Sequence, residues 1–197
     1  MAPTTKDRIA QALVHLLSYT TLEKITVKKL IETANVNKST YYYHFSQISD
    51  VTKYIEKQFI NEFQNQFSHG LNSSEIFGND TILVDNSSAM FEYIYEHKDI
   101  FSALINSSIR DEFRDEFVHC IRSMTDKYNW KICKPGHDES YLSAAQKKYY
   151  TYHNAYSQYA FLECWAKNNY EESPRELADL ICYLHSLTPS DIVLVHH

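Results

Sequence analysis

Residues 38–44, KSTYYYH, place a cation, hydroxyls, phenols and an imidazole in one short segment. If the segment is helical, Tyr41 and Phe45 lie four residues apart and can share a buried face. The side chains left pointing away from that face are those of Lys38, Ser39, Tyr42 and Tyr43. Such an outward face is poor core material, because charged and hydroxyl groups lose hydrogen bonds to water when they are buried. Ammonium and hydroxyl groups do bind phosphate oxygens and base edges, so these residues indicate a helix that reads DNA.

Two capped helices joined by a tight turn would present this face. Thr26 is a suitable N-cap for a first helix, along which apolar residues recur at helical spacing up to Ala34. Asn35 tolerates the left-handed backbone that ends a helix, and Asn37 is a suitable N-cap for the next one. The pattern predicts a helix-turn-helix.

The stretches ITVKKLIETANV and STYYYHF resemble the DNA-binding domain of the TetR-like (tetracycline-repressor family) transcription regulators. The resemblance begins near Asp7 and covers about the first third of the chain. At two positions the chain departs from the family pattern. Asn35 stands where the family usually has glycine, and Ile48 stands near the point where a basic residue often precedes the fourth helix.

The resemblance implies an all-α protein with a three-helix helix-turn-helix head, residues 1–48, and a helical ligand-binding and dimerisation body, residues 49–197. It also implies a set of DNA-contacting residues at the start of one helix and along the next: Thr26, Lys28, Lys38, Ser39, Thr40, Tyr42, Tyr43 and His44. A helical hairpin that only packs, with its tyrosines half buried, is the structural alternative. Heads of this kind act in pairs about 34 Å apart, so we expect a homodimer on a near-palindromic double-stranded DNA operator.

Composition and charge agree with this division of the chain. The 197 residues include three glycines and four prolines, which favours an all-helical fold and leaves little room for glycine-rich phosphate loops. Residues 1–57 carry a net charge of +3 and the remainder −9, as expected for a DNA-binding head on an acidic body, although chance variation is the alternative. No apolar run is long enough for a membrane span and no apolar signal segment is present, so we expect a cytoplasmic protein without a membrane partner.

The rest of the chain predicts further helices and two loops. A long helix is expected from a cap at Ser49 to Phe67, with loops at about residues 69–86 and 129–139. The last two helices are expected over Tyr141–Asn168 and Pro174–Leu187, the second with a capping box of Ser173 and Glu176. By resemblance, these two helices pair with their counterparts in a second subunit.

The resemblance further implies an effector cavity in the body for a small molecule. Aromatic side chains would line an apolar cavity and offer a few hydrogen bonds. The candidates are Phe91, Tyr95, Phe101, Phe113, Tyr149, Tyr152 and Tyr156. The competing explanation for each of them is a place in the core or in the dimer interface.

Other kinds of site have weaker support. His119, Cys120, Cys133 and His137 could in principle bind zinc, but their spacing matches no standard ligand pattern, so we expect no metal and no cofactor. No catalytic motif accompanies the cysteines and histidines, so we expect no enzyme. The function predicted is that of a dimeric repressor controlled by a small-molecule effector. The alternative is an accessory protein-binding subunit that keeps the head fold, an interpretation favoured by the missing basic residue near Ile48.

Overall fold

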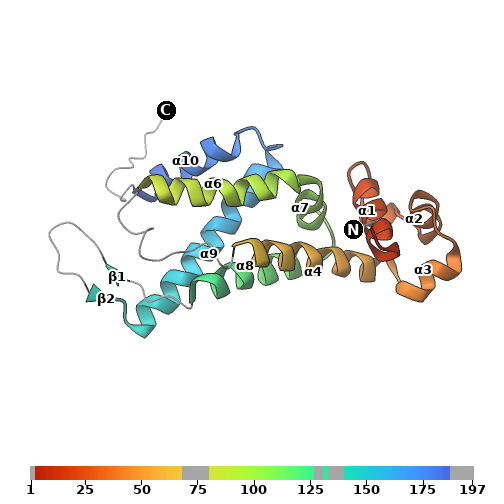
Figure 1. Cartoon of the computed structure of the whole chain (residues 1–197), viewed down its shortest axis with the longest axis horizontal. Helices are drawn as coiled ribbons and strands as arrows, with labels where there is room; N and C mark the ends of the chain where they lie inside the picture. The colour runs from red at the N-terminus through yellow and green to blue at the C-terminus, as the bar shows by residue number, and fades with distance from the viewer. Residues whose placement is uncertain (1–2, 68–79, 127–130, 133–139, 187–197) are drawn as a thin grey trace, which may run out of the picture. The chain divides into compact units, whose positions relative to one another are not determined.

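The computed structural model describes residues 3–67, 80–126, 131–132 and 140–186 (Figure 1). The expected all-α class is confirmed, because among these residues the only departure from helices and turns is a two-residue antiparallel pair, β1 (Lys131–Ile132) and β2 (Ser140–Tyr141). The chain forms two compact units, residues 1–65 with 97–120 and residues 66–96 with 121–197. No helix in the described part of the chain is both long and apolar enough to span a membrane.

The first unit begins with α1 (Thr5–Leu17), the short 3-10 helix η1 (Leu22–Lys24), α2 (Val27–Thr33) and α3 (Lys38–His44). Thr4 and Asp7 form a capping box at the start of α1. The apolar stripe of α1 is buried together with Leu30 of α2 and Tyr41 of α3. These three helices therefore share one small core, which holds α3 by its inner face.

The predicted turn between α2 and α3 is confirmed. Thr26 caps α2 by accepting a hydrogen bond from the Lys29 amide at 3.2 Å, and Asn37 caps α3 by accepting from the Thr40 amide at 2.7 Å. Asn35 has a φ of 51°, in the left-handed region that favours glycine. Its carbonyl oxygen accepts a hydrogen bond from the Arg8 guanidinium at 3.2 Å, which joins α1 to the turn.

The positive φ at Asn35 restricts which residues fit this position, and substitutions can test this. We expect Asn35→Ala to lower the free energy of unfolding by about 1 kcal/mol, because both residues carry a Cβ that crowds the carbonyl in this conformation, and only the short polar side chain of asparagine can offset that cost by bonding locally. Asn35→Gly is the matched variant, and we expect it to leave stability unchanged or to raise it by less than about 1 kcal/mol. Urea denaturation of both variants measures this difference. Equal effects of alanine and glycine would show that the turn has no need of a positive φ.

The first unit is completed by most of α4 (Ile48–Phe67), by α7 (Lys98–Ile105) and by the first part of α8 (Arg110–Asp126). The expected cap at Ser49 is wrong, since α4 begins at Ile48. The Asp50 carboxylate accepts hydrogen bonds from the amides of Ser46 at 2.9 Å and Gln47 at 3.0 Å, and so satisfies the helix start from within its first turn.

Four phenylalanines form the centre of this packing. Phe59, Phe101, Phe113 and Phe117 are at most 2% exposed, and their ring centroids lie 5.6 to 6.1 Å apart. Phe63 adds a fifth ring, 4.9 Å from Phe117. These spacings are those of tilted and edge-to-face aromatic pairs, which contribute beyond their buried area.

One carboxylate lies on the buried side of α4. Glu56 is 4% exposed, and its Oε1 has no hydrogen-bond partner among the described residues. Burial, and after it the charges of Glu112 and Glu116 on α8, raise the pKa of Glu56 above its ordinary value of 4.5. Folding therefore favours the protonated carboxyl, and stability falls as the pH rises from about 4.5 through the folded-state pKa.

We expect Glu56→Gln to raise the free energy of unfolding at pH 8 by about 1–2 kcal/mol, because the amide keeps the shape and removes the buried charge. Below pH 4.5 the two proteins should be equally stable, since the native carboxyl is then protonated. Urea denaturation across this pH range tests both statements. Glu62→Gln, an exposed change on the same helix, serves as the control and should stay within about 0.5 kcal/mol. A marked loss of stability in Glu56→Gln at pH 8 would mean that the ionised carboxylate has a stabilising partner.

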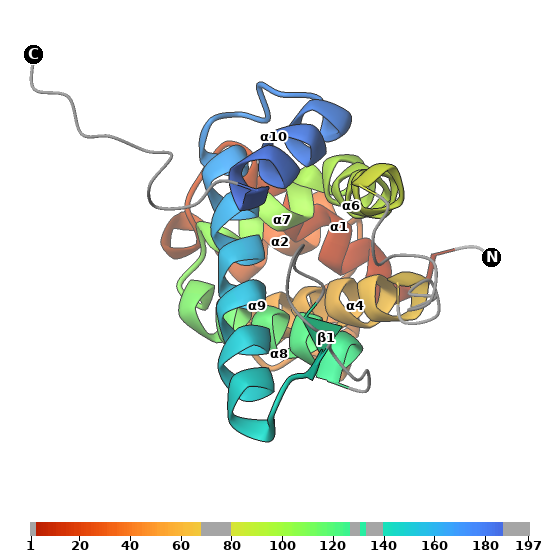
Figure 2. The same ribbon diagram turned by 90° about the vertical axis from the view of Figure 1, so that its left-hand side faces the viewer.

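The second unit contains α6 (Asp80–Glu96), α9 (Ala144–Lys167) and α10 (Pro174–Ser186). α6 and α10 lie side by side, as both views show (Figures 1 and 2). Trp165 of α9 is 2% exposed, and its ring packs against Phe91 and Tyr95 of α6 and Tyr170. Its indole N–H donates to the Glu172 carbonyl at 2.9 Å, which fixes the connection to α10.

Two helix starts in this unit differ from those expected. The expected loop over residues 69–86 is wrong in its last part, because α6 begins at Asp80, and residues 69–79 lie outside the described residues. The expected start at Tyr141 is also wrong. Tyr141 lies in β2, and α9 begins at Ala144 because Ser143 and Gln146 form a capping box there.

The predicted start of α10 is confirmed. The Ser173 amide donates to the Glu176 carboxylate at 2.8 Å, and the Glu176 amide donates to the Ser173 hydroxyl at 3.3 Å. The expected loop over residues 129–139 lies outside the described residues except for β1.

Candidate DNA-binding surface

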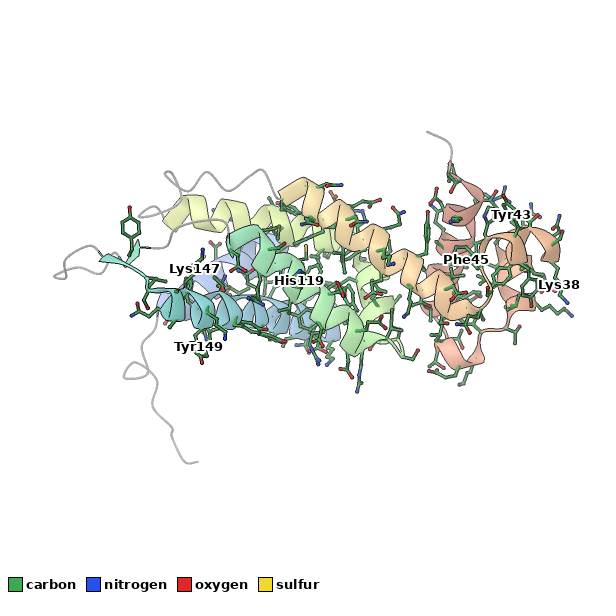
Figure 3. The ribbon with its side chains drawn as sticks, turned by 90° about the horizontal axis from the view of Figure 1, so that it is seen from below. Lys38, Tyr43, Phe45, His119, Lys147 and Tyr149 are labelled. Carbon is green, nitrogen blue, oxygen red and sulfur yellow. The ribbon has the colours of Figure 1, made fainter. Side chains whose placement is uncertain are left out.

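All eight residues expected to contact DNA lie in the first unit, at the start of α2 and along α3. We call this set the recognition surface: Thr26, Lys28, Lys38, Ser39, Thr40, Tyr42, Tyr43 and His44. Tyr43 is 84% exposed and Tyr42 is 49% exposed, whereas Tyr41, on the inner face of α3, is fully buried. Figure 3 shows Lys38 and Tyr43 on the outer side of α3. The predicted division of α3 into a buried and an outward face is therefore confirmed.

The cations of this surface are available for phosphate. Lys28 and Lys38 are exposed and form no ion pair among the described residues. Lys38 Nζ lies 5.9 Å from the centroid of the Tyr42 ring, within the range of a cation–π contact. That contact keeps the ammonium and the phenol on the same side of α3, where one phosphate or base edge could meet both.

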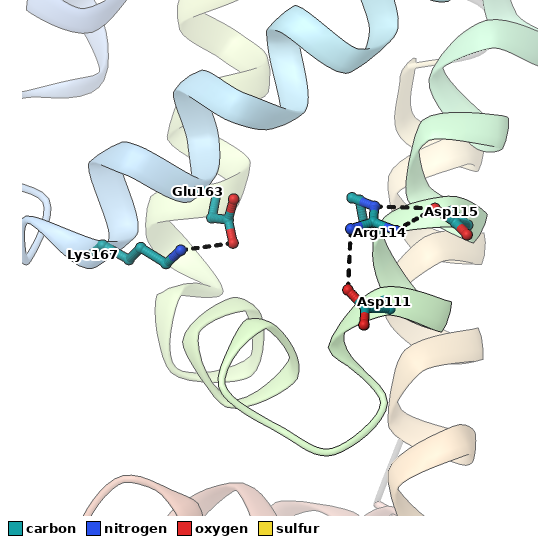
Figure 4. Close-up of polar contacts among 5 residues, drawn as sticks. All are labelled: Asp111, Arg114, Asp115, Glu163 and Lys167. Carbon is teal, nitrogen blue, oxygen red and sulfur yellow. Dashed lines mark hydrogen bonds and ion pairs between the residues drawn. The ribbon is translucent and has the colours of Figure 1, made fainter.

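Some cations elsewhere among the described residues form ion pairs with neighbouring carboxylates. Arg114 on α8 pairs with Asp111 at 3.1 Å and with Asp115 at 3.0 Å, and Lys167 on α9 pairs with Glu163 at 2.9 Å (Figure 4). Lys28 and Lys38 have no such ion pair among the described residues, so a phosphate at the recognition surface would displace water and counter-ions rather than a protein carboxylate.

A hydrogen bond to Asn37 holds the Ser39 side chain at the start of α3. The Ser39 hydroxyl donates to the Asn37 side-chain oxygen at 2.7 Å, and the Thr40 amide donates to the same oxygen. Ser39 would therefore have to release this bond before donating to DNA. Tyr43 and His44 lie edge to face with ring centroids 4.9 Å apart, and His44 is only half exposed.

One residue that supports this surface could not be found from spacing. Arg8 donates to the Asn35 carbonyl from 27 positions away, and neither the α1 pattern nor the turn pattern indicates the bond. Tyr54 of α4 likewise donates to Asp7 at 2.8 Å and so joins α4 to the start of α1. Lys29, the next residue after Lys28, is also exposed on α2.

The seven residues expected to line an effector cavity lie in several different surroundings. Phe101 and Phe113 belong to the phenylalanine cluster of the first unit, and Phe91 is buried against Trp165 in the second. Tyr95 is 39% exposed and stacks on Trp165 at 5.9 Å. Tyr149, Tyr152 and Tyr156 are exposed on α9, and Tyr152 and Tyr156 stack on each other at 5.9 Å.

Exposed apolar side chains occur on both of the last two helices. Leu180 and Leu184, one turn apart on α10, are 43% and 39% exposed, and Tyr183 beside them is 62% exposed. Leu177 and Ile181 of the same helix are buried. α10 therefore has one apolar face inside its own unit and a second one outside it.

Two of the four residues that could in principle bind zinc lie among the described residues. His119 is exposed, and Cys120 is 4% exposed, where burial raises the pKa of its thiol to about 11. Cys133 and His137 lie outside the described residues. No group of three or more metal-ligating side chains is found in the part of the chain that the structure describes.

Comparisons with known proteins agree with the helical architecture. A TetR model described as the C-terminal region of transcriptional regulators matches residues 85–186. Comparison with curated protein sequences finds no match.

Solved structures share the fold along most of their length. The dihydroxyacetone kinase operon activator DhaS is 19% identical with a TM-score of 0.58, covering 91% of this chain and 93% of its own. A TetR transcriptional regulator from Streptococcus agalactiae 2603V is 19% identical with a TM-score of 0.59, covering 91% and 92%.

The transcriptional regulator FadR from Bacillus subtilis, solved in complex with stearoyl-CoA, is 14% identical with a TM-score of 0.53, covering 90% and 95%. At these identities the likeness establishes the fold. The family match adds what the fold alone does not, because it spans residues 85–186, more than half of the 197-residue chain. The chain therefore belongs to the TetR family of transcriptional regulators.

Proposed function

We propose that this transcriptional regulator is a homodimeric repressor that binds a near-palindromic DNA operator and is released by a small-molecule effector. Residues 1–48 would hold the DNA, and residues 49–197 would carry dimerisation and effector binding. The observation that carries the proposal is the recognition surface. There α3 is held by a buried inner face and presents Lys38, which has no ion pair with any described residue, together with Tyr42 on the outer face.

The apolar outer face of α10 supports the homodimer. Leu180, Tyr183 and Leu184 are exposed on the single chain, and burying such side chains against a second copy would release water from all of them. Tyr149, Tyr152 and Tyr156 on α9 offer further aromatic surface of the kind enriched in interfaces. A pair of heads about one helical turn of DNA apart would then read the two half-sites of an operator.

Substitutions on the outer face of α10 test the proposed dimer. We expect the double variant Leu180→Glu/Leu184→Glu to weaken dimerisation at least about 100-fold, because it places charges in the apolar centre of the interface. Sedimentation equilibrium measures the change. Tyr19→Glu, at a residue that is 60% exposed in the first unit, is the control and should leave the dimer intact. An unchanged dimer in the double variant would mean that the subunits meet through another face.

Effector control would act as a shift in population. A ligand that binds more tightly to a conformation unable to span the operator lowers DNA affinity by the difference between its two binding energies. The FadR structure shows that a chain of this fold can hold an acyl-CoA. Three of the residues expected to line the cavity, Phe91, Phe101 and Phe113, are buried and apolar as an acyl chain would require, whereas the four tyrosines of that set are exposed.

The experiment that tests this function is binding of the full chain to DNA from just upstream of its own coding region, across a range of salt. We expect a specific complex whose affinity falls steeply, with a slope of about −0.9 for every phosphate neutralised. Random DNA of the same length is the control. Absence of binding even to random DNA at low salt would overturn the proposal and favour the accessory protein-binding subunit. Ile48 at the start of α4, where the family often has a basic residue nearby, already points toward that alternative.

A further inference from the structure

The first unit contains a groove of about 500 Å³ between three of its helices. One side is formed by α1 from Asp7 to Ser18, a second by α4 from Tyr54 to Glu62, and the third by residues 97–100 at the start of α7. α1 and α7 are in contact in this unit. None of the seven residues expected to line the effector cavity borders the groove.

The floor of the groove is apolar. Ala10, Ile55 and Phe59 are at most 9% exposed, and Val14 and Ile100 stand half buried beside them. The His97 ring lies 6.4 Å from Phe59 in an edge-to-face arrangement. A flat apolar group seated here would replace the water over the partly exposed Val14 and Ile100, which is favourable.

The rim of the groove is acidic. Asp7, Glu62 and Asp99 each come from a different helix, and no lysine or arginine occurs among the described residues that line the groove. Asp7 accepts hydrogen bonds from the Thr4 hydroxyl at 2.7 Å, the Thr4 amide at 2.8 Å and Tyr54 at 2.8 Å. These bonds, led by that of the Thr4 side chain, lower the pKa of Asp7, so it is ionised at neutral pH. Asp7 lies beside Tyr54, and the Lys6 ammonium lies 5.7 Å from the centroid of the same ring, so this end of the groove carries both charges. The acidic charge of the rim therefore comes from Glu62 and Asp99, and it attracts a cation and repels an anion.

We propose that this groove binds an organic ammonium ion with a flat aromatic body. The ring would lie against the half-buried side chains of Val14 and Ile100, and the ammonium group would lie beside the carboxylate of Glu62 or that of Asp99. The size is suitable, since pockets for small ligands measure about 300–1,000 Å³. A ligand in this place touches α1, which belongs to the core that carries α3, together with α4 and α7. That its binding alters DNA affinity rests on the proposed function, whereas the binding itself does not.

The test uses three probes of one shape and different charge: 1-naphthylmethylammonium, 1-naphthalenemethanol and 1-naphthoate. Binding to the full chain without DNA is measured by isothermal titration calorimetry at low salt. We expect the ammonium probe to bind roughly tenfold more tightly than the alcohol, and the carboxylate probe to bind most weakly. Equal binding of all three probes would overturn the proposal.

Two kinds of variant assign the binding to the groove. Glu62→Gln/Asp99→Asn removes two rim charges without changing shape and should weaken the ammonium probe roughly five- to tenfold. Glu32→Gln/Glu171→Gln makes the same change in net charge at exposed residues outside the groove and should leave affinity unchanged. Gln11→Trp, from an exposed position on α1, should fill the groove and abolish binding. Undiminished binding in Gln11→Trp, or equal losses in both double variants, would overturn the site.

Operator binding is measured separately from probe binding. If the ammonium probe binds and Gln11→Trp abolishes its binding, the groove is a ligand site whether or not the chain binds an operator. If the operator is bound and the probes fail to discriminate by charge, the proposed function stands and the groove proposal falls.

Discussion

Replacing Lys38 and Tyr42 together by alanine is expected to lower operator affinity by about 100-fold or more, because each interaction with a phosphate or base edge contributes on the order of 1–3 kcal/mol. Both side chains extend from the outer face of α3 and are exposed. Their removal should therefore not unfold the protein, and a loss of operator affinity would come from lost contacts with DNA. The dependence of affinity on salt should also weaken, by about 0.9 in slope for each phosphate that is no longer neutralised and so by about twice that for a dimer. Fluorescence anisotropy with labelled operator at several salt concentrations measures both quantities.

The matched control is Lys24→Ala/Tyr19→Ala. It removes one lysine and one exposed tyrosine from the same unit, outside the recognition surface. Affinity and salt slope should stay as in the unaltered protein. Equal reductions of affinity in the two double variants would show that net charge, and not the face of α3, governs DNA binding.

Single variants separate the contribution of Tyr42 to DNA affinity from that of its buried neighbour Tyr41. Tyr42→Phe removes only a hydroxyl and should weaken binding less than Tyr42→Ala if the ring itself packs on DNA. The Tyr41 hydroxyl is buried without a partner among the described residues, and burial raises its pKa to about 12. Tyr41→Phe should therefore leave DNA affinity unchanged, and it provides a control for substitutions within α3.

Phe117→Ala is expected to lower the free energy of unfolding by about 3–5 kcal/mol, the usual cost of deleting a buried aromatic ring and leaving a cavity. Phe117 is fully buried and touches rings from three helices: Phe59 and Phe63 of α4, Phe101 of α7 and Phe113 of α8. No neighbour can fill the space without leaving its own packing position. A destabilisation of this size is a large part of the stability of an ordinary domain.

Thermal and urea denaturation of Phe117→Ala, each followed by circular dichroism, measure the effect. Tyr43→Ala is the control, because that ring is 84% exposed and its removal should change stability by less than about 0.5 kcal/mol. A destabilisation below about 1 kcal/mol in Phe117→Ala would mean that the cluster is loosely packed. In that case Phe101 and Phe113 would be better placed to admit a ligand than the closely spaced rings suggest.

The boundaries of most helices were predictable because their signals are local. A cap joins residues two or three positions apart, so the sequence itself indicates the helix starts at Thr26, Asn37 and Ser173. The errors arose where a second local signal competed. Ser49 is a good cap by type, but Asp50 accepts the amides of Ser46 and Gln47 and starts α4 earlier.

The division of α3 into an inner and an outer face was predictable for the same reason. A seven-residue helix has one inner and one outer face, and Tyr41 with Phe45 identifies the inner one. Which aromatic residues of the body surround a common space was not predictable. Phe101 and Tyr149 both fit an apolar stripe or an aromatic cavity by type, yet one is fully buried and the other is 72% exposed.

The sequence by itself determined the helical class, the capped turn that presents α3, and the side chains on its outer face. Each depends on hydrogen bonds and spacings within a few residues, which amino-acid types encode directly. Only the tertiary structure decided that Arg8 holds the Asn35 carbonyl, that Glu56 is buried beside the carboxylates of α8, and that three helices enclose an acidic groove. These features join residues from 27 to more than 80 positions apart, and no periodicity along the chain records which helices pack together.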